Sequence, residues 1–371
     1  MPSEYPTHFY FKYSKARYNF LSAASETATF IESWQHPLRG LGNEKLYVDL
    51  AWFGDRNAEK VLVLVSGTHG VEGYCGSGIQ VGSIRTRWHY KADEDVAIAM
   101  IHGLNPYGMS HLRRVNEDGV DINRNFIDFR QPLPKNSLYD ELAEVIIPQH
   151  WTEAIQGKTL DTIAEYIYQT PSGVADLARG QYKYWYAPFY GGEVTTWSNR
   201  IFQQICDRYF SDKAIGLLDY HTGLGQYATG QLMCLPEESQ VQQARSIWGD
   251  KVVTTGSENS VAAYIPTGTL MAALQTKLTN SSYIAAVYEF GTIPEQEVFN
   301  ALRADHWLHL HGDLDTEEAL FIKQNMLDAF YCDRSDWQKS VCELAFTAQD
   351  ELLIGLRSLG TMDNGQWTMD N

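Results

Sequence analysis

The chain has 371 residues, and its 46 acidic and 29 basic side chains give a formal net charge of −17 at pH 7. This excess of negative charge repels nucleic-acid phosphates and anionic membrane surfaces, so we expect neither as a partner. The sequence has no signal-peptide pattern and no apolar stretch long enough for a membrane span, and its five cysteines lack disulfide or metal spacing. These features predict a cytoplasmic protein with reduced cysteines.

The first two predicted elements precede the first candidate site. Apolar side chains recur at helical spacing over residues 15–34, which predicts an N-terminal helix. Residues 46–53 then alternate like a strand, and Gly54 begins a turn. We therefore expect this strand to form a β-hairpin with the apolar run that begins at Val61.

The stretch from Val61 to Gly73, VLVLVSGTHGVEG, carries the first candidate site. An apolar run that stops at a Ser-Gly turn is typical of a parallel strand buried on both faces, and ligands bind at the ends of such strands. His69 and Glu72 lie three residues apart in this turn, so both side chains can reach one cation. The pattern indicates half of a zinc site, and a histidine that only caps the strand end is the alternative.

Other histidines lie in less suggestive places. His150 and Glu153 repeat the His-x-x-Glu spacing, but no buried strand precedes them, and we interpret them as part of a solvated helix face. His306, His309 and His311 lie near the end of a predicted helix, where histidines interact favourably with the helix dipole. We expect no metal at either place.

A strand over residues 96–102 leads into LNPYGMSHLRRVNEDGVDINRNFIDF, a 26-residue segment with little periodicity. Loops of this length are uncommon unless they are functional. The segment contains Arg113, Arg114 and Arg124 together with four asparagines, and such planar donors are suited to binding an anionic group. The alternative is a surface network of arginine and aspartate side chains.

Two further strands end on polar residues. Residues 132–186 are mostly helical by pattern, and residues 214–220 form a buried strand that leads to His221. Asp219 shares the face of His221 and can orient a neighbouring group as a hydrogen-bond acceptor. The run YIAAVYEFGT places Glu289 at the end of a later apolar strand, where a carboxylate is costly to bury unless it is paired or functional.

The alternation of strands and helices predicts an α/β fold with three layers, α/β/α, and a mixed, mostly parallel central sheet. We expect a single domain over residues 1–371, with a catalytic core at about residues 45–312. The N-terminal helix over residues 15–34 and a C-terminal helical extension over residues 313–357 complete this domain.

Several of these segments resemble, in this order, those of the zinc carboxypeptidases. GTHGVEG resembles the first ligand pair of that superfamily, NPYG with RRVNEDGVDINRNF resembles its substrate-binding segment, and LDYHTG resembles its third-ligand strand. AYIPTG resembles the segment with the mobile tyrosine, and VYEFGT resembles the general-base strand. The similarity runs from about Val61 to Thr292, and the stretch from Asn-Pro-x-Gly to Asn-Arg-Asn-Phe is its most specific part.

The resemblance implies roles for particular residues of this chain. The ligands of one Zn²⁺ per chain would be His69, Glu72 and His221, with water at the fourth position. Arg114 would stabilise the oxyanion, and Glu289 would be the general base. The residues that would bind the substrate are Asn123, Arg124 and Tyr264.

The implied function is hydrolysis of an amide bond next to a free carboxylate, in a small peptide or an N-acyl amino acid. The His-Gly-x-Glu turn is also similar to that of the aspartoacylase and succinylglutamate-desuccinylase group, so an N-acyl amino acid deacylase is one alternative. The segment YAPFYGG and the C-terminal helices resemble an uncharacterised branch of carboxypeptidase-like bacterial proteins. A metal-free relic that binds peptides is the other alternative. No feature of the sequence predicts the oligomeric state.

Overall fold

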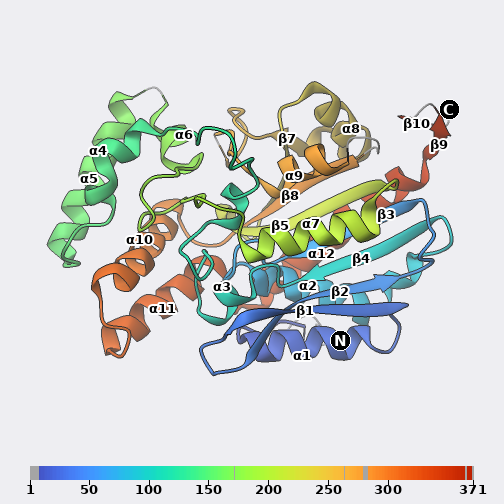
Figure 1. Cartoon of the computed structure of the whole chain (residues 1–371), viewed down its shortest axis with the longest axis horizontal. Helices are drawn as coiled ribbons and strands as arrows, with labels where there is room; N and C mark the ends of the chain where they lie inside the picture. The colour runs from blue at the N-terminus through green and yellow to red at the C-terminus, as the bar shows by residue number, and fades with distance from the viewer. Residues whose placement is uncertain (1–7, 171, 263, 279–282, 364–365, 370–371) are drawn as a thin grey trace.

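The computed structural model describes residues 8–170, 172–262, 264–278, 283–363 and 366–369, and Figure 1 shows their arrangement. The strands are β1 (Phe30–Arg39), β2 (Lys45–Phe53), β3 (Lys60–Ser66), β4 (Val96–His102), β5 (Ala214–Tyr227), β6 (Gly230–Cys234), β7 (Val252–Thr254), β8 (Tyr283–Gly291), β9 (Leu359–Asp363) and β10 (Gln366–Met369). The α-helices are α1 (Tyr13–Ala24), α2 (Gly73–Arg85), α3 (Pro106–Ser110), α4 (Ser137–Ile146), α5 (Glu153–Gln169), α6 (Gly173–Ala178), α7 (Trp197–Ile205), α8 (Glu238–Trp248), α9 (Leu270–Lys277), α10 (Glu295–His311), α11 (Glu317–Phe330) and α12 (Ser335–Arg357). None of the helices in the described ranges is both long and apolar enough to cross a membrane.

One eight-stranded sheet forms the centre of the molecule, and its strand order is β1-β2-β4-β3-β5-β8-β6-β7. The adjacent strands β4, β3, β5 and β8 run parallel, whereas β2 is antiparallel to both of its neighbours and β6 is antiparallel to β8. Central parallel strands are buried on both faces, which explains why these segments are continuous apolar runs. The predicted mixed, mostly parallel sheet is confirmed.

Side chains on β3 alternate between the two faces of the sheet. Leu62 and Leu64 pack into one core with side chains of α1, α2 and α12. Val61, Val63 and Val65 pack into a second core with side chains of α7 and α9. Because the strands contribute apolar side chains to both faces, helices cover both faces, and the predicted three-layer α/β/α fold is confirmed. That the whole chain forms a single domain stays a prediction.

Helices α4 and α5 lie at one end of the molecule, away from the sheet and near α10 and α11 (Figure 1). Buried Arg303 of α10 joins these helices, because its Nε donates to Ile146 O at 2.8 Å and its Nη2 donates to Thr159 Oγ1 at 2.6 Å. Ile146 is the last residue of α4, so its carbonyl has no hydrogen-bond donor further along the same helix. A single guanidinium therefore connects α4, α5 and α10.

The N-terminal region differs from the prediction of one helix over residues 15–34. Helix α1 ends at Ala24, and strand β1 begins at Phe30. Phe30 pairs with Trp52 of β2, and the two rings stack with centroids 5.7 Å apart. The spacing of apolar residues here fits a helix locally, but pairing with β2 decides the conformation because strand formation depends on cross-strand neighbours.

The predicted β-hairpin between β2 and β3 is also wrong. β2 pairs antiparallel with β1 and β4, whereas β3 pairs in parallel with β4 and β5. Both edges of β3 are therefore hydrogen-bonded to parallel strands, and no edge remains for β2. The antiparallel pair that follows the first helix is β1 with β2.

Candidate metal centre

The candidate site lies where the chain connections change direction across the sheet. From β3 the chain runs through α2 to β4 on one side, and β5 lies on the other side of β3. Open α/β sheets bind ligands at such a switch point, at the carboxyl ends of the strands. His69 and Glu72 follow β3, and His221 lies in β5. The sheet order thus brings together two histidines that are 152 residues apart in the sequence.

The turn after β3 has a defined conformation. Gly67 has a φ of +76°, a left-handed conformation that glycine adopts without a steric penalty. Gly70 donates its N–H to Arg114 O at 3.1 Å, which joins the turn to the long segment that follows β4. The turn that carries His69 and Glu72 is therefore fixed against the segment that contains Arg114.

Three potential ligand groups converge at this turn. The Nδ1 atoms of His69 and His221 are 3.1 Å apart. The two Glu72 oxygens lie 2.9 Å from His69 Nδ1 and 3.1 Å from His221 Nδ1. Zinc bonds of about 2.0–2.1 Å in a tetrahedral site separate the ligand atoms by about 3.3 Å, so these spacings fit. Across the ranges that the structure describes, this is the only group of three or more metal-binding side chains whose ligand atoms all lie within 4.8 Å of one another.

The outer nitrogen of each histidine is bonded to a buried aspartate. His69 Nε2 lies 3.0 Å from Asp121 Oδ1, and His221 Nε2 lies 2.8 Å from Asp219 Oδ2. If a metal ion binds both Nδ1 atoms, the proton of each neutral imidazole lies on Nε2 and is donated to the aspartate. Without a metal ion, a proton on Nδ1 can be donated to Glu72 instead. The donor set therefore fits a cation.

The pKa shifts of Glu72 and His221 also indicate a site that favours positive charge. Burial alone would raise the pKa of Glu72, but the neighbouring His69 and hydrogen bonds with both histidines bring it well below its usual range. Burial also opposes a charge on His221, yet the carboxylates of Asp219 and Glu72 raise the pKa of His221 well above its usual value. These surroundings keep Glu72 anionic and favour a positive charge beside it.

Arg114 lies directly beside these three side chains. Its Nε is 3.3 Å from Glu72 Oε1, and its Nη1 donates to Asp121. Burial opposes the charge of the guanidinium, but Asp121 and Glu72 raise the pKa of Arg114 above its usual value. The arrangement provides a fixed positive charge next to the candidate metal ligands.

Asn123 and Arg124 follow Asp121 in a short turn and line the same cavity. Arg124 donates Nε and Nη2 to Ala178 O at 3.2 and 2.8 Å, and it donates Nη1 to Asn123 O at 2.7 Å. A guanidinium has five N–H groups, so within the described residues part of this fork stays available to a ligand. Asn123 Oδ1 accepts from Leu270 N at 2.8 Å. The Nδ2 group of the same amide can then act as a donor to a ligand.

Glu289 is the register partner of His221 in the parallel pair β5 and β8. Its Oε1 accepts from Leu224 N at 3.2 Å. Burial and the nearby charge of Glu72 raise the pKa of Glu289 to about 8. A buried carboxyl whose proton affinity is raised in this way is a typical general acid or base.

All eight site residues predicted from the sequence line one cavity of about 350 Å³. The guanidinium carbon of Arg124 lies 5.9 Å from the centre of the Tyr264 ring, which forms part of the wall. Most of the remaining wall is apolar and includes Met233, Val261 and Val287. The structure therefore brings these residues to one place, and their chemical roles stay predictions.

The other histidines lie in different surroundings. His150 and Glu153 are both exposed, as expected for a solvated surface. His306 Nδ1 lies 3.0 Å from Tyr186 O, and His309 Nε2 lies 2.8 Å from the ammonium of Lys323. His306 and His309 therefore contact groups outside the candidate metal centre.

The sequence alone did not identify Asp121, which bonds to both His69 and Arg114. The only local signal for Asp121 is its position two residues before Asn-Arg-Asn, in the long segment for which the sequence predicts a function. Asp219 has the contact that its predicted orienting role requires, since one oxygen lies 2.8 Å from His221 Nε2 and the other accepts from Thr68 Oγ1 at 2.8 Å.

One solved structure shares the fold. Thrombin activatable fibrinolysis inhibitor (TAFI), a carboxypeptidase-like structure, matches 96% of this chain and 76% of its own, with a TM-score of 0.54 and 11% sequence identity. This match confirms the carboxypeptidase-like fold that the sequence motifs predicted. A putative metallopeptidase from Shewanella amazonensis SB2B matches 81% of this chain and 93% of its own, with a TM-score of 0.41 and 12% identity. An aspartoacylase family protein from Mesorhizobium loti MAFF303099 matches 79% and 70%, with a TM-score of 0.38 and 14% identity.

Comparison of sequences adds a family. No curated protein matches the chain. The family model DUF2817 matches residues 9–343, a range that includes the whole eight-stranded sheet and all eight candidate site residues. The chain therefore belongs to DUF2817, a family described as proteins of unknown function.

Proposed function

We propose that the protein is a zinc-dependent, metallocarboxypeptidase-like hydrolase that cleaves an amide bond adjacent to a free carboxylate. One observation carries this proposal: two imidazole nitrogens, the Glu72 carboxylate and the separate Glu289 carboxyl meet in a single cavity with two arginines. The carboxypeptidase-like fold supports it.

The metal would be held by His69, Glu72 and His221. Two histidines and one carboxylate leave a fourth position for water or substrate, as catalytic zinc sites require. When bound, zinc lowers the pKa of a water molecule to about 7 and polarises a carbonyl group. Asp121 and Asp219 keep both imidazoles in the tautomer that presents Nδ1 to the metal.

Glu289 would move the proton. Its carboxylate would accept a proton from the attacking water and would then donate it to the nitrogen of the leaving amine. Leu224 N–H holds Glu289 Oε1, which fixes the direction in which the carboxyl points. Arg114 would place its positive charge next to the oxygen that becomes negative during attack, where such a charge stabilises the transition state.

Arg124 and Asn123 would bind the free carboxylate of the substrate. A guanidinium fork matches a carboxylate with two parallel hydrogen bonds, which a lysine cannot reproduce. Tyr264 lies against Arg124 and would close the cavity over the bound end. The apolar wall would then contact the side chain of the terminal residue.

The proposal is tested with pairs of substrates that differ only at the terminus. Zinc-loaded protein is incubated with short peptides that end in a free acid and with the matching C-terminal amides, and the released amine is quantified. We expect cleavage of the free acids and hardly any cleavage of the amides, because the amides lack the charge that Arg124 binds. Equal cleavage of both would exclude a role for Arg124 and leave a general zinc amidohydrolase.

The same assay includes N-acetylated amino acids. Because the carboxylate contacts and the proton acceptor serve either substrate, the ratio of peptide to acyl amino acid turnover separates a carboxypeptidase from a deacylase. A zinc-loaded protein that binds but cleaves none of these substrates would favour the peptide-binding relic.

A further inference from the structure

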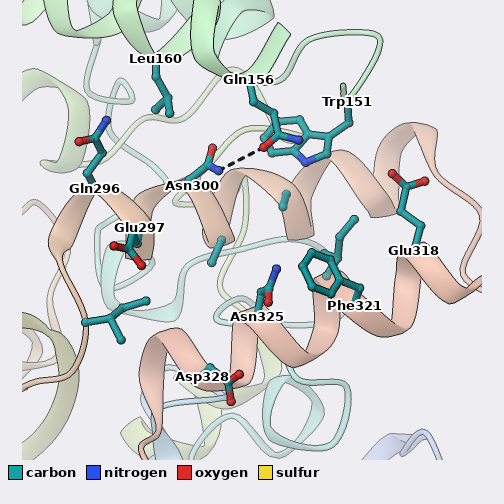
Figure 2. Close-up of a pocket in the computed structure, with 14 residues that line it drawn as sticks. Trp151, Gln156, Leu160, Gln296, Glu297, Asn300, Glu318, Phe321, Asn325 and Asp328 are labelled. Carbon is teal, nitrogen blue, oxygen red and sulfur yellow. Dashed lines mark hydrogen bonds between the residues drawn. The ribbon is translucent and has the colours of Figure 1, made fainter. Parts of the chain in front are cut away.

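A second cavity, of about 570 Å³, lies between α5, α10 and α11 (Figure 2). It meets the catalytic cavity at Gln296, whose side chain lines both. Each of the three helices contributes at least one residue to each cavity, so the two cavities follow the same helices. On α5, for example, Gln156 lines the second cavity and Ile167 lines the catalytic cavity, and on α11 Asp328 and Phe330 do the same.

The charged side chains that line the second cavity, which we call the distal groove, are all acidic. Glu297, Glu318 and Asp328 line it, and none of its described lining residues is Lys, Arg or His. Within the described part of the chain none of the three carboxylates forms an ion pair. Trp151 and the largely exposed Phe321 add aromatic surface (Figure 2). Aromatic faces next to carboxylates favour long cationic side chains, since the stem contacts the ring and the charge meets the anion.

The upper wall of the distal groove is held in place by Arg303. Its Nη1 donates to Asn300 Oδ1 at 3.1 Å, and its guanidinium carbon lies 5.1 Å from the centre of the Trp151 ring. Asn300 Nδ2 in turn donates to Gln156 Oε1 at 3.4 Å, the contact drawn as a dashed line in Figure 2. These contacts orient the wall before any ligand binds, which lowers the entropy that binding costs.

The dimensions of the distal groove suit an extended peptide. On α10 it runs from Gln296 to Ala304, a helical rise of about 12 Å, and on α11 it runs from Glu318 to Asp328, a rise of about 15 Å. An extended chain advances about 3.3–3.6 Å per residue, so roughly four residues fit. A substrate whose terminal carboxylate is enclosed beside Arg124 can leave the catalytic cavity only with the chain that precedes the scissile bond.

We propose that the distal groove binds about four residues of a peptide substrate on the N-terminal side of the scissile bond, and that it prefers Lys or Arg there. This inference rests on the proposed hydrolase function. It narrows the substrate class from any small molecule with a free carboxylate to peptides with basic residues before the cleavage site.

The test uses peptides that share one C-terminal pair of residues and carry four more residues upstream, with Lys, Ala or Glu in the extension. For the zinc-loaded wild-type chain we expect kcat/KM to be about tenfold higher with the Lys extension than with the Glu extension, since each exposed charge pair contributes little and three act together. High salt should reduce this ratio. The groove variant Glu297→Gln/Glu318→Gln/Asp328→Asn should bring the ratio close to one.

A matched control removes the same charge elsewhere. Glu26→Gln/Glu94→Gln/Asp250→Asn changes three exposed acidic side chains outside the distal groove, and it should keep the preference for Lys. Equal rates with Lys and Glu extensions in the wild type, or a preference that persists in the groove variant, would overturn the proposal. A gain from the extension that is independent of charge would likewise exclude a basic segment as the occupant.

A binding measurement separates this inference from the hydrolase proposal. Fluorescence anisotropy of a labelled Lys-rich peptide is measured with the wild-type chain, the groove variant and the control variant. If no peptide is cleaved but the groove variant alone loses affinity, the distal groove stands as a binding site for basic peptides, and the hydrolase proposal fails. If short free-acid peptides are cleaved and the Lys extension adds neither affinity nor rate, the hydrolase proposal stands and the distal groove fails.

Discussion

The Nδ1 atoms of His69 and His221 lie 3.1 Å apart, and Nε2 of each ring lies within hydrogen-bond distance of an aspartate. Two imidazole nitrogens are thus held close together, with the Glu72 carboxylate beside them. This arrangement favours a positive charge, either a proton or a metal ion, so the metal content of the protein is the first quantity to measure.

We expect the purified protein to hold about one zinc ion per chain after incubation with zinc and dialysis, because three ligands on ordered strand ends make an open catalytic site. His221→Ala should lose the ion, since it removes one of the three ligands. His150→Ala should keep it, because His150 is exposed and outside the cluster. Elemental analysis of the three proteins decides this, and zinc loss in the His150 variant or an empty wild type would contradict the ligand assignment.

The aspartate behind His69 should control how tightly the metal binds. Asp121→Asn removes the charge that orients His69 and pairs with Arg114, and such changes lower metal affinity by about 10- to 100-fold. Competition with a chromogenic chelator measures the zinc dissociation constant. Asp128→Asn, the same change at an exposed position seven residues later, should leave affinity unchanged. An unchanged affinity in the Asp121 variant would show that the histidine needs no orienting partner.

Glu289 should act on turnover and not on metal binding. Glu289→Gln keeps the size of the side chain but cannot accept a proton, so we expect kcat to fall by about 10²- to 10⁴-fold while the zinc content stays the same. Glu193→Gln, at an exposed position away from the cavity, serves as the control. Zinc loss in the Glu289 variant would instead make this residue a metal ligand.

The predicted carboxylate contact can be separated from the chemical step. Arg124→Lys keeps the positive charge but lacks the planar fork, so KM for free-acid peptides should rise sharply while zinc stays bound. Complete loss of such a charge contact costs about 2–5 kcal/mol, which sets the upper limit of the effect. Arg130→Lys, at an exposed arginine, is the control. Steady-state kinetics would contradict the assignment if KM were unchanged and only kcat fell.

Stability should depend on a buried cluster of charges around Asp305. Asp305 is completely buried, and it accepts from Arg113 Nε at 2.9 Å and from Lys323 Nζ at 2.5 Å. Asp305→Asn leaves two cations without their partner, so we expect the free energy of unfolding to fall by about 3–5 kcal/mol at pH 7. Urea denaturation measures this change, and Asp161→Asn on the exposed side of α5 should have little effect.

The same cluster of charges predicts the direction of a pH dependence. Burial would raise the pKa of Asp305, but Lys323 and Arg113 bring it well below the value of about 3.9 in an unfolded chain. A carboxyl with a lowered pKa stabilises the fold fully above its unfolded pKa, and this contribution is lost as the pH falls further. The difference in stability between wild type and Asp305→Asn should therefore be constant near neutral pH and narrow below about pH 4. A difference that grows with acidification would contradict this assignment.

The sequence by itself determined the buried strands and the chemistry at their ends. The apolar runs over residues 61–66, 96–102 and 283–291 are continuous because strands covered on both faces need apolar side chains at every position. Polar groups at the end of such a run or shortly after it are then conspicuous, which is why Glu289 and His69 could be identified without coordinates. Their spacing along the chain was enough to suggest a metal and a proton acceptor.

Only the tertiary structure decided which segments are neighbours. The apolar residues around Phe30 fit a helical period, but pairing with β2 made them a strand. Asp121 became the partner of His69 across 52 residues of sequence, and the distal groove arose where α5 meets α10 and α11. Local periodicity reports which face of an element is buried, but it does not specify the partner that buries that face. That choice depends on hydrogen bonds and packing between distant segments, which exist only once the chain has closed on itself.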